Sequence, residues 1–206
     1  MEIMFQGLDE NLVFPNPIDQ FAQWYNDAQN AQELEPNAMV LATYLPGDYP
    51  SARWVLMKEF STRGWVFFTN YESRKGQELR ANPKASLTFY WTSLGRQVRI
   101  AGDVGPIDSE ESARYFATRP LDSRIGAWAS PQSRPLHSRQ ELVSLFEQKN
   151  QEFGQLETIP LPPHWGGYLL QPVYLEFWLF QDHRLHDRIA YQKEAEQAWR
   201  IQRLAP

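Results

Sequence analysis

Residues 177–188 read FWLFQDHRLHDR, and the second half of this segment is predicted to form a strand near the C-terminal end of the chain. Strand side chains alternate between two faces, so Arg184, His186 and Arg188 are expected to point the same way, with Asp187 opposite. That face offers no acid to balance the three donors. They therefore either protect a solvated sheet edge or bind an electron-rich group, such as a carboxylate, a phosphate or a polar aromatic ring. The spacing alone leaves both interpretations open.

Outward from this segment, the chain is predicted to consist mainly of β-hairpins with four helices between them and one helix before the first strand. The order does not alternate strand and helix regularly, which argues against a doubly wound parallel sheet. We expect a mainly β protein with peripheral helices, an antiparallel barrel of seven or eight strands. The predicted strands are 38–45, 51–60, 64–70, 86–92, 97–104, 168–180, 185–192 and 199–203, and the predicted helices are 17–28, 73–81, 108–118, 121–129 and 138–153. Asn16 and Ser73 are predicted to cap the first two of these helices, and Asp108 with Glu111 has the spacing of a capping box for the third.

Composition limits the class of protein. The chain has 206 residues, of which 42% are hydrophobic and 14% aromatic, and its net charge of −5 argues against general binding to nucleic acid or to an anionic membrane. It has no cysteine, so disulfides, thiol nucleophiles and thiolate metal sites are excluded. We expect a poorly ordered N-terminal segment over residues 1–16, a single domain over residues 17–206 and a cytoplasmic location.

Two clusters of side chains are candidate phosphate sites. Ser73, Arg74 and Lys75 begin a predicted helix, where free backbone N–H groups and two cations favour an anion. The alternative is that the two cations are ordinary surface charges.

Tyr115, Arg119 and Ser123 are spaced by four and four, and so fall on one side if helical geometry persists through Pro120. A phenol, a guanidinium and a hydroxyl together suit a phosphate ester, although ordinary surface hydrogen bonding explains the spacing equally well. Lys58 ends a predicted strand, where its side chain can reach a cleft.

Several common site types are not supported by the sequence. His183 and His186 are expected on opposite strand faces, and no carboxylate cluster has the spacing of metal ligands. The chain has no GxSxG elbow, no GxGxxG after a strand and no GxxxxGK[ST].

These same stretches resemble the pyridoxine/pyridoxamine 5′-phosphate oxidase family. The resemblance runs from about Pro17 to the last residue, and its most specific parts are HRLHDR and RPLDSRIGAW. The matching segments are RWVLMK (53–58), VFFTNYESRK (66–75), RQVRIAG (96–102), YFATRPLDSRIGAWAS (115–130), PQS (131–133), WGGY (165–168), EFW (176–178), HRLHDR (183–188) and RLAP (203–206).

The resemblance implies an FMN-binding split β-barrel of antiparallel Greek-key type that works as a homodimer, with flavin between the subunits. It implies oxidation of pyridoxamine or pyridoxine 5′-phosphate at C4′ to pyridoxal 5′-phosphate. Hydride passes to flavin N5, and O2 reoxidises the flavin and becomes H2O2. No nucleic acid, membrane or metal is expected as a partner.

The resemblance also sorts the candidate residues. It assigns Arg184 and His186 as catalytic residues that place the pyridine ring over the flavin. The expected FMN contacts are Arg53, Trp54, Val55, Leu56, Met57, Lys58, Phe68, Thr69, Arg74, Lys75, Gln97, Gln132, Ser133, Trp178 and Arg188. The expected substrate contacts are Lys58, Tyr115, Arg119, Ser123, Arg184 and His186.

The N-terminus departs from the family pattern. The family often carries a basic segment with a tyrosine that folds over the substrate, and residues 1–14 have no Arg-Arg-x-Tyr pattern. Two alternatives therefore stay open: a related FMN oxidase of phenazine-type biosynthesis that takes a fused tricyclic acid, and a non-catalytic flavin or pyridoxal phosphate binding protein.

Overall fold

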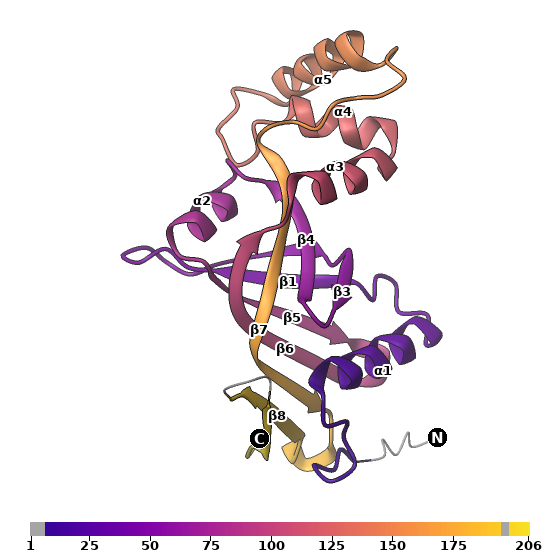
Figure 1. Ribbon diagram of the computed structural model, residues 1–206, viewed down its shortest axis with the longest axis vertical. Helices are drawn as coiled ribbons and strands as arrows, with labels where there is room; N and C mark the ends of the chain where they lie inside the picture. The colour runs from indigo at the N-terminus through magenta and orange to yellow at the C-terminus, as the bar shows by residue number, and fades with distance from the viewer. Residues whose placement is uncertain (1–6, 195–197) are drawn as a thin grey trace.

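The computed structural model describes residues 7–194 and 198–206, and within them the strands form one nine-stranded sheet in which every pairing is antiparallel (Figure 1). The strand order is β2-β1-β5-β6-β7-β4-β3, and β8 pairs with β7 while β9 pairs with β8. The strands are β1 (Ala38–Thr43), β2 (Ser51–Leu56), β3 (Glu59–Ser61), β4 (Gly64–Asn70), β5 (Lys84–Trp91), β6 (Arg96–Pro106), β7 (Trp165–Leu179), β8 (Asp187–Lys193) and β9 (Trp199–Arg203).

Five α-helices and two short 3-10 helices complete the described chain. They are α1 (Pro17–Asn30), α2 (Arg74–Ala81), α3 (Ser109–Thr118), α4 (Leu121–Ala129), α5 (Arg139–Phe153), η1 (Thr92–Leu94) and η2 (Asp182–Arg184). The predicted caps explain several of these boundaries, since Asn16 accepts a hydrogen bond from the backbone N–H of Ile18 and Ser73 accepts one from Gly76. The expected mainly β architecture with peripheral helices is confirmed.

The main core lies between the sheet and α1. Along β5 buried and exposed positions alternate, as expected for a strand with one face in the core. Phe21 of α1 is fully buried and packs edge-to-face against Trp65 and Phe89, with ring centroids 5.1 Å apart in both pairs. Much of the aromatic content of the sequence is thus used in the core.

The long strand β7 organises the sheet, because it pairs with β6, β4 and β8. A bulge interrupts its pairing with β6 between Ala101 and Gly102. A Cβ on Gly102 would lie 2.0 Å from the carbonyl oxygen of Gln171, so only glycine permits this close approach. In Figure 1, α3, α4 and α5 gather near the start of β7, and β8 lies at its far end.

A second apolar cluster joins α3, α4 and α5 to the sheet. Its buried members include Phe116 of α3, Ile125 of α4, Phe153 of α5 and Trp165 of β7. This packing fixes α3 and α4 against the start of β7, and it therefore positions the polar side chains of those two helices.

Residues 1–16 were expected to be poorly ordered. Residues 1–6 of this segment lie outside the described part of the chain. Residues 7–16 lie against β8 and β9. The backbone N–H of Leu8 donates to Asp187 at 3.0 Å, and the Tyr191 hydroxyl donates to the Phe14 carbonyl at 2.8 Å. No helix in the described ranges has the length and apolar character needed to cross a membrane.

Three sequence predictions about local structure were wrong. The segment 51–60 forms two strands, β2 and β3, instead of one. Asp108 caps α3 by accepting from Glu110, but Glu111 pairs with Arg63 instead of closing a capping box.

The third wrong prediction concerns the segment 177–188 and the strand expected over 185–192. Its strand begins at Asp187, and Arg184 belongs to η2, where φ is 62°. The alternation argument therefore does not apply to Arg184 and His186.

Candidate active site

A pocket of about 580 Å³ lies where β2, β4, α2, α3, α4 and the start of β7 meet. Its lining includes four cationic side chains and no carboxylate, so it suits an anionic ligand. We call it the cation pocket, and it is lined by Arg53, Trp54, Val55, Leu56, Lys58, Phe68, Thr69, Asn70, Lys75, Tyr115, Thr118, Arg119, Pro120, Ser123, Gln132 and Trp165.

One end of the cation pocket is built around Lys75. Its Nζ donates to Gln132 Oε1 at 2.9 Å and to Thr69 Oγ1 at 3.2 Å. Burial, together with the nearby Arg53 guanidinium, lowers the pKa of Lys75 to about 8, against the opposing effect of Glu78. An anion at this position would favour the protonated amine.

Arg53 reaches the same end from β2, but most of its donors point inward. Its terminal nitrogens donate to the Leu41 carbonyl at 3.1 Å, to Thr43 Oγ1 at 2.6 Å and to the Ser51 hydroxyl, and one of them pairs with Glu78 at 3.2 Å. Burial lowers the pKa of Arg53, while Glu78 acts in the opposite direction. The carboxylate of Glu78 is thus the counter-ion that compensates the desolvation of this guanidinium.

Arg74 does not line the cation pocket. Its Nε pairs with Glu78 at 2.8 Å, and its Nη2 pairs with Asp48 at 3.3 Å. The structure therefore separates the two neighbouring cations of the predicted anion site, with Lys75 in the pocket and Arg74 more than half exposed outside it.

The other end of the pocket brings together Lys58, Tyr115, Arg119 and Ser123. The Pro120 break that separates α3 from α4 does not prevent the last three from converging, as their spacing predicts. The Arg119 guanidinium lies 4.8 Å from the centre of the Trp165 ring.

Arg119 has unused capacity to bind an anion. Burial lowers its pKa, and its buried Nη1 has no hydrogen-bond partner among the residues that the structure describes. A buried donor without a partner is costly, and an anion entering this end of the pocket would satisfy it.

Three aromatic rings in the pocket lining pack on one another beside Arg119. Phe68 stacks on Tyr115 with centroids 4.0 Å apart and on Trp165 with centroids 5.3 Å apart. Gly167 allows this packing, since a Cβ there would lie 2.9 Å from the Phe68 ring. The pocket therefore combines cations with an aromatic wall, which suits a flat molecule that carries phosphate.

A second group of predicted site residues lies at the far end of β7, and we call it the β8 corner: Gln97, Trp178, Arg184, His186 and Arg188. Gln97, Trp178 and Arg188 are partners in one row across β6, β7 and β8. The expectation that no acid balances these donors was wrong for Arg188, because its acid lies on the neighbouring strand. Arg188 Nε donates to Glu176 of β7 at 2.9 Å, which lowers the pKa of this buried carboxyl despite the opposing effect of burial.

His186 packs against Trp178 in a tilted arrangement, with ring centroids 4.5 Å apart. Its Nδ1 accepts a hydrogen bond from the backbone N–H of Gln181 at 3.1 Å, so in the neutral ring the proton is on Nε2. The backbone at His183 and Arg184 is left-handed, with φ of 57° and 62°. Two such residues in succession without glycine are strained, and strain of this kind concentrates at functional sites.

Arg184 is exposed and makes no ion pair within residues 7–194 and 198–206. Two other predicted contacts lie apart from the cation pocket as well. Met57 is in the core and only 4% exposed, and Ser133 follows Gln132 in a left-handed conformation with φ of 69°.

Sequence reasoning missed four residues of the pocket wall, which are Asn70, Thr118, Pro120 and Trp165. Each is next to, or within, a motif that was recognised. Trp165 opens the WGGY segment, and the two glycines that bring β7 close to Phe68 and Tyr71 were the available signal.

The cation pocket and the β8 corner are far apart in one chain. Trp165 lines the pocket and Trp178 belongs to the corner, and at about 3.3 Å per residue they are on the order of 40 Å apart along β7. One small ligand therefore cannot contact both groups within a single chain.

Comparison with known proteins decides the family. Residues 26–151 match the family model described as pyridoxamine 5′-phosphate oxidase, and residues 165–206 match the one described as pyridoxine 5′-phosphate oxidase C-terminal dimerisation region. The chain belongs to the pyridoxamine 5′-phosphate oxidase family. The resemblance expected from the sequence motifs is confirmed.

Curated relatives carry the same family name. The pyridoxine/pyridoxamine 5′-phosphate oxidase of Bordetella avium (strain 197N) is 53% identical over 96% of this chain and 92% of its own length. The protein of that name from Burkholderia thailandensis is 54% identical over 97% of this chain and 94% of its own length.

Two solved structures have the same fold. PhzG from Burkholderia lata 383, in complex with tetrahydrophenazine-1-carboxylic acid, superposes with a TM-score of 0.91 at 29% identity and covers 99% of both chains. An FMN-binding, pyridoxamine 5′-phosphate oxidase-related protein from Nostoc punctiforme has a TM-score of 0.72 at 20% identity and covers 92% of this chain and 97% of its own. The sheet is thus the split barrel that the resemblance implied.

Proposed function

We propose that this protein is an FMN-dependent oxidase that converts pyridoxamine 5′-phosphate and pyridoxine 5′-phosphate to pyridoxal 5′-phosphate. The observation that carries the proposal is the cation pocket, which combines four cations, no carboxylate and a flat aromatic wall. Two phosphate-bearing flat molecules, a cofactor and a substrate, account for the presence of cations at both ends.

The donor set at the Lys75 end fits the phosphate of FMN. Lys75, Arg53 and Thr69 all line this end, and Gln132 already orients the Lys75 amine. The strand segment 53–56 and Phe68 would hold the flavin beside them, and Gln97, Trp178 and Arg188 would contact the polar edge of its ring. FMN held by these residues would supply the two-electron acceptor for the oxidation, with O2 as the final oxidant and H2O2 as its product.

The other end fits the substrate phosphate. Arg119 has the free buried donor described above, and Lys58, Tyr115 and Ser123 add an ammonium, a phenol and a hydroxyl. Arg184 and the Nε2–H of His186 would orient the pyridine ring so that C4′ faces the flavin. The alcohol loses hydride and its hydroxyl proton to become the aldehyde, and the amine gives an imine that water hydrolyses to the aldehyde and ammonia.

The distance along β7 supports a homodimer with each flavin between two chains. A substrate in the cation pocket of one chain would meet Arg184 and His186 only if a second copy supplied its β8 corner. The family description of residues 165–206 as a dimerisation region agrees with this arrangement. Two-fold symmetry would then give two equivalent sites.

The proposed activity is tested by giving the purified, FMN-loaded protein pyridoxine 5′-phosphate or pyridoxamine 5′-phosphate in air. We expect equal amounts of pyridoxal 5′-phosphate and H2O2. Flavin binding without turnover of either substrate would contradict the oxidase and favour the non-catalytic binding protein.

The similarity to PhzG favours a second candidate, an FMN oxidase that acts on a fused tricyclic acid. Such an acid carries a carboxylate and no phosphate ester, so it does not need Lys58, Tyr115, Arg119 and Ser123 together. Turnover of tetrahydrophenazine-1-carboxylic acid without turnover of either vitamin B6 phosphate would establish the second candidate. The cytoplasmic location stays a prediction.

A further inference from the structure

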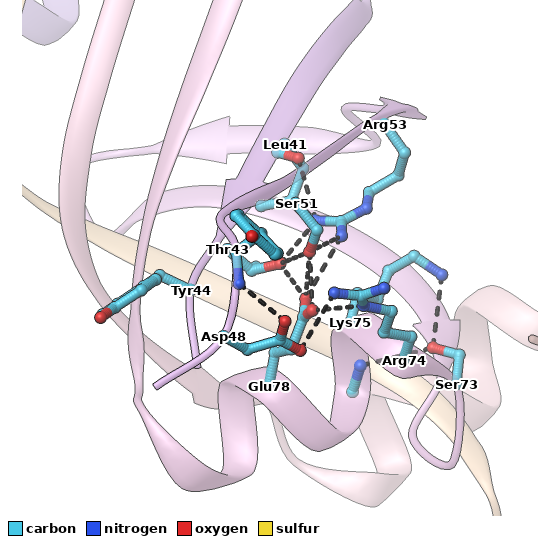
Figure 2. A network of polar contacts seen from close by, with 12 residues as sticks. Leu41, Thr43, Tyr44, Asp48, Ser51, Arg53, Ser73, Arg74, Lys75 and Glu78 are labelled. Carbon is cyan, nitrogen blue, oxygen red and sulfur yellow. Dashed lines mark hydrogen bonds and ion pairs between the residues drawn. The ribbon is translucent and has the colours of Figure 1, made fainter. Parts of the chain in front are cut away.

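Glu78 of α2 is a buried carboxylate that does not line the cation pocket, although it contacts one cation of the pocket and one outside it. Only 4% of its side chain is exposed. Figure 2 shows it between Arg53 and Arg74, with the hydroxyls of Thr43 and Ser51 beside its carboxylate. A buried charge of this kind is tolerated only where its partners are well placed.

The two hydroxyls connect the guanidinium of Arg53 to the carboxylate. Thr43 Oγ1 accepts from Arg53 Nη1 at 2.6 Å and donates to Glu78 Oε2. Ser51 Oγ accepts from Arg53 Nη2 and donates to Glu78 at 2.6 Å. Each hydroxyl has only one proton, so the carboxylate determines which way both hydroxyls point.

This arrangement fixes the orientation of Arg53. A guanidinium has five N–H donors. In Arg53, Nη1 donates to Leu41 and Thr43, and Nη2 donates to Ser51 and Glu78. Nε–H is then the donor of Arg53 that has no partner among the described residues, and Arg53 lines the pocket. The same carboxylate accepts from Arg74 Nε at 2.8 Å and keeps that side chain on the Asp48 side.

We propose that Glu78 is a positioning residue for the flavin phosphate, which holds Arg53 with one N–H toward the cation pocket and keeps Arg74 outside it. The inference rests on the proposed function, because it assigns the Lys75 end of the pocket to a phosphate. The inference concerns the affinity of the protein for FMN and its preference for FMN over riboflavin. Glu78 itself touches no ligand.

Two effects of the Glu78 charge oppose each other, and their balance decides the expected result. A carboxylate near a phosphate repels it, but this one is paired with two guanidiniums and lies behind Arg53. Without it, Arg53, Arg74 and Lys75 repel one another and Arg53 loses its fixed orientation. The Arg53 charge already lowers the pKa of Lys75 and Glu78 raises it, so loss of Glu78 also leaves Lys75 less protonated. We therefore expect weaker phosphate binding.

The test compares the affinities for FMN and for riboflavin, which lacks the phosphate, in the full-length protein freed of flavin. Glu78→Gln should weaken FMN binding by about ten- to hundredfold and leave riboflavin binding within about twofold. The loss of FMN affinity with rising pH should also begin at a lower pH than in the wild type. The groups that face Lys75 in this titration are Arg53 of β2, Glu78 and Ser73 at α2, Thr69 of β4 and Gln132.

Glu72→Gln is the matched control. It removes the same charge from the neighbouring turn, where Glu72 is exposed and pairs with Arg134 at 2.7 Å, away from the cation pocket. It should leave both affinities unchanged. An equal loss for FMN and riboflavin in Glu78→Gln, or tighter binding of FMN, would overturn the inference.

A second variant keeps the inference testable where Glu78→Gln does not fold. Ser51→Ala removes one connecting hydroxyl and should weaken FMN about threefold to tenfold without weakening riboflavin. An unchanged preference for FMN over riboflavin in Ser51→Ala would count against the inference. A wild-type protein with no preference for FMN would instead contradict the proposed function.

Discussion

The cation pocket and the β8 corner both carry arginines assigned to ligands, but their environments differ. In the pocket, Arg53 is held by four partners and the half-buried Arg119 packs against Trp165. In the corner, Arg184 is exposed on a left-handed backbone and lacks any ion pair within the described part of the chain. The pocket is therefore preorganised within one chain, whereas in the proposed dimer the donors of the corner act only against a partner surface.

The largest expected effect is in the corner. Arg184→Ala should lower turnover of pyridoxine 5′-phosphate by about hundredfold or more, because the substrate ring loses the group that orients it. FMN content should stay unchanged, since Arg184 lies away from the phosphate end. Steady-state kinetics and flavin absorbance on the same sample measure both quantities. Arg139→Ala, at an exposed position of α5, is the control and should leave turnover unaltered.

The second prediction separates two neighbouring cations. Lys75→Ala should raise the dissociation constant of FMN by about ten- to hundredfold, because the amine would donate directly to the phosphate. Arg74→Ala should change it by no more than about threefold, since Arg74 is exposed and held by Glu78 and Asp48. Titration of flavin fluorescence measures both. Equal losses in the two variants would mean that Arg74 also enters the pocket.

The third prediction concerns pH. The pKa of Lys75 is about 8 in the flavin-free protein, so the amine loses its charge as the pH rises above about 8. The affinity of the protein for FMN should therefore decrease above this pH. Riboflavin should show no such step, and neither should Lys75→Ala with FMN.

The same lowered pKa has a consequence for stability. An unfolded lysine keeps its proton to about pH 10.5, so the unfolded chain binds more protons than the folded one between about 8 and 10.5. In that window the free energy of unfolding of the flavin-free protein should therefore increase with pH. Denaturant unfolding at several pH values measures this, and a decrease would contradict the lowered pKa.

The smallest expected effect is at the flavin ring. Glu176→Gln removes the charge that holds Arg188 and should weaken FMN and riboflavin by the same factor, about threefold to tenfold. This contrasts with Glu78→Gln, which should discriminate between the two ligands. A selective loss of FMN in Glu176→Gln would place Arg188 near the phosphate instead.

Local signals in the sequence predicted most of the fold. The hairpin of β5 and β6, the capped starts of α1 and α2, and the break at Pro120 all depend on neighbouring residues, which short motifs describe well. The convergence of Tyr115, Arg119 and Ser123 followed from helical spacing for the same reason.

Contacts between distant segments could not be predicted in this way. Arg188 pairs with Glu176 on β7. Glu78 accepts hydrogen bonds from Thr43 and Ser51, which lie 35 and 27 residues earlier in the chain. The turn at Arg184 has a left-handed backbone without glycine, so no sequence signal opposed the strand prediction there. These are the features that distinguish the preorganised pocket from the open corner.

The central claim is that each active site combines the cation pocket of one chain with the β8 corner of another. Mixing Arg119→Ala and Arg184→Ala chains after reversible dissociation tests it most directly, with turnover as the readout. Each variant alone should be almost inactive, but in a mixed dimer one site receives both intact halves, so activity should recover to about a quarter of the wild-type value. If the mixture stays as inactive as the separate variants, both residues act within the same chain and the claim is wrong.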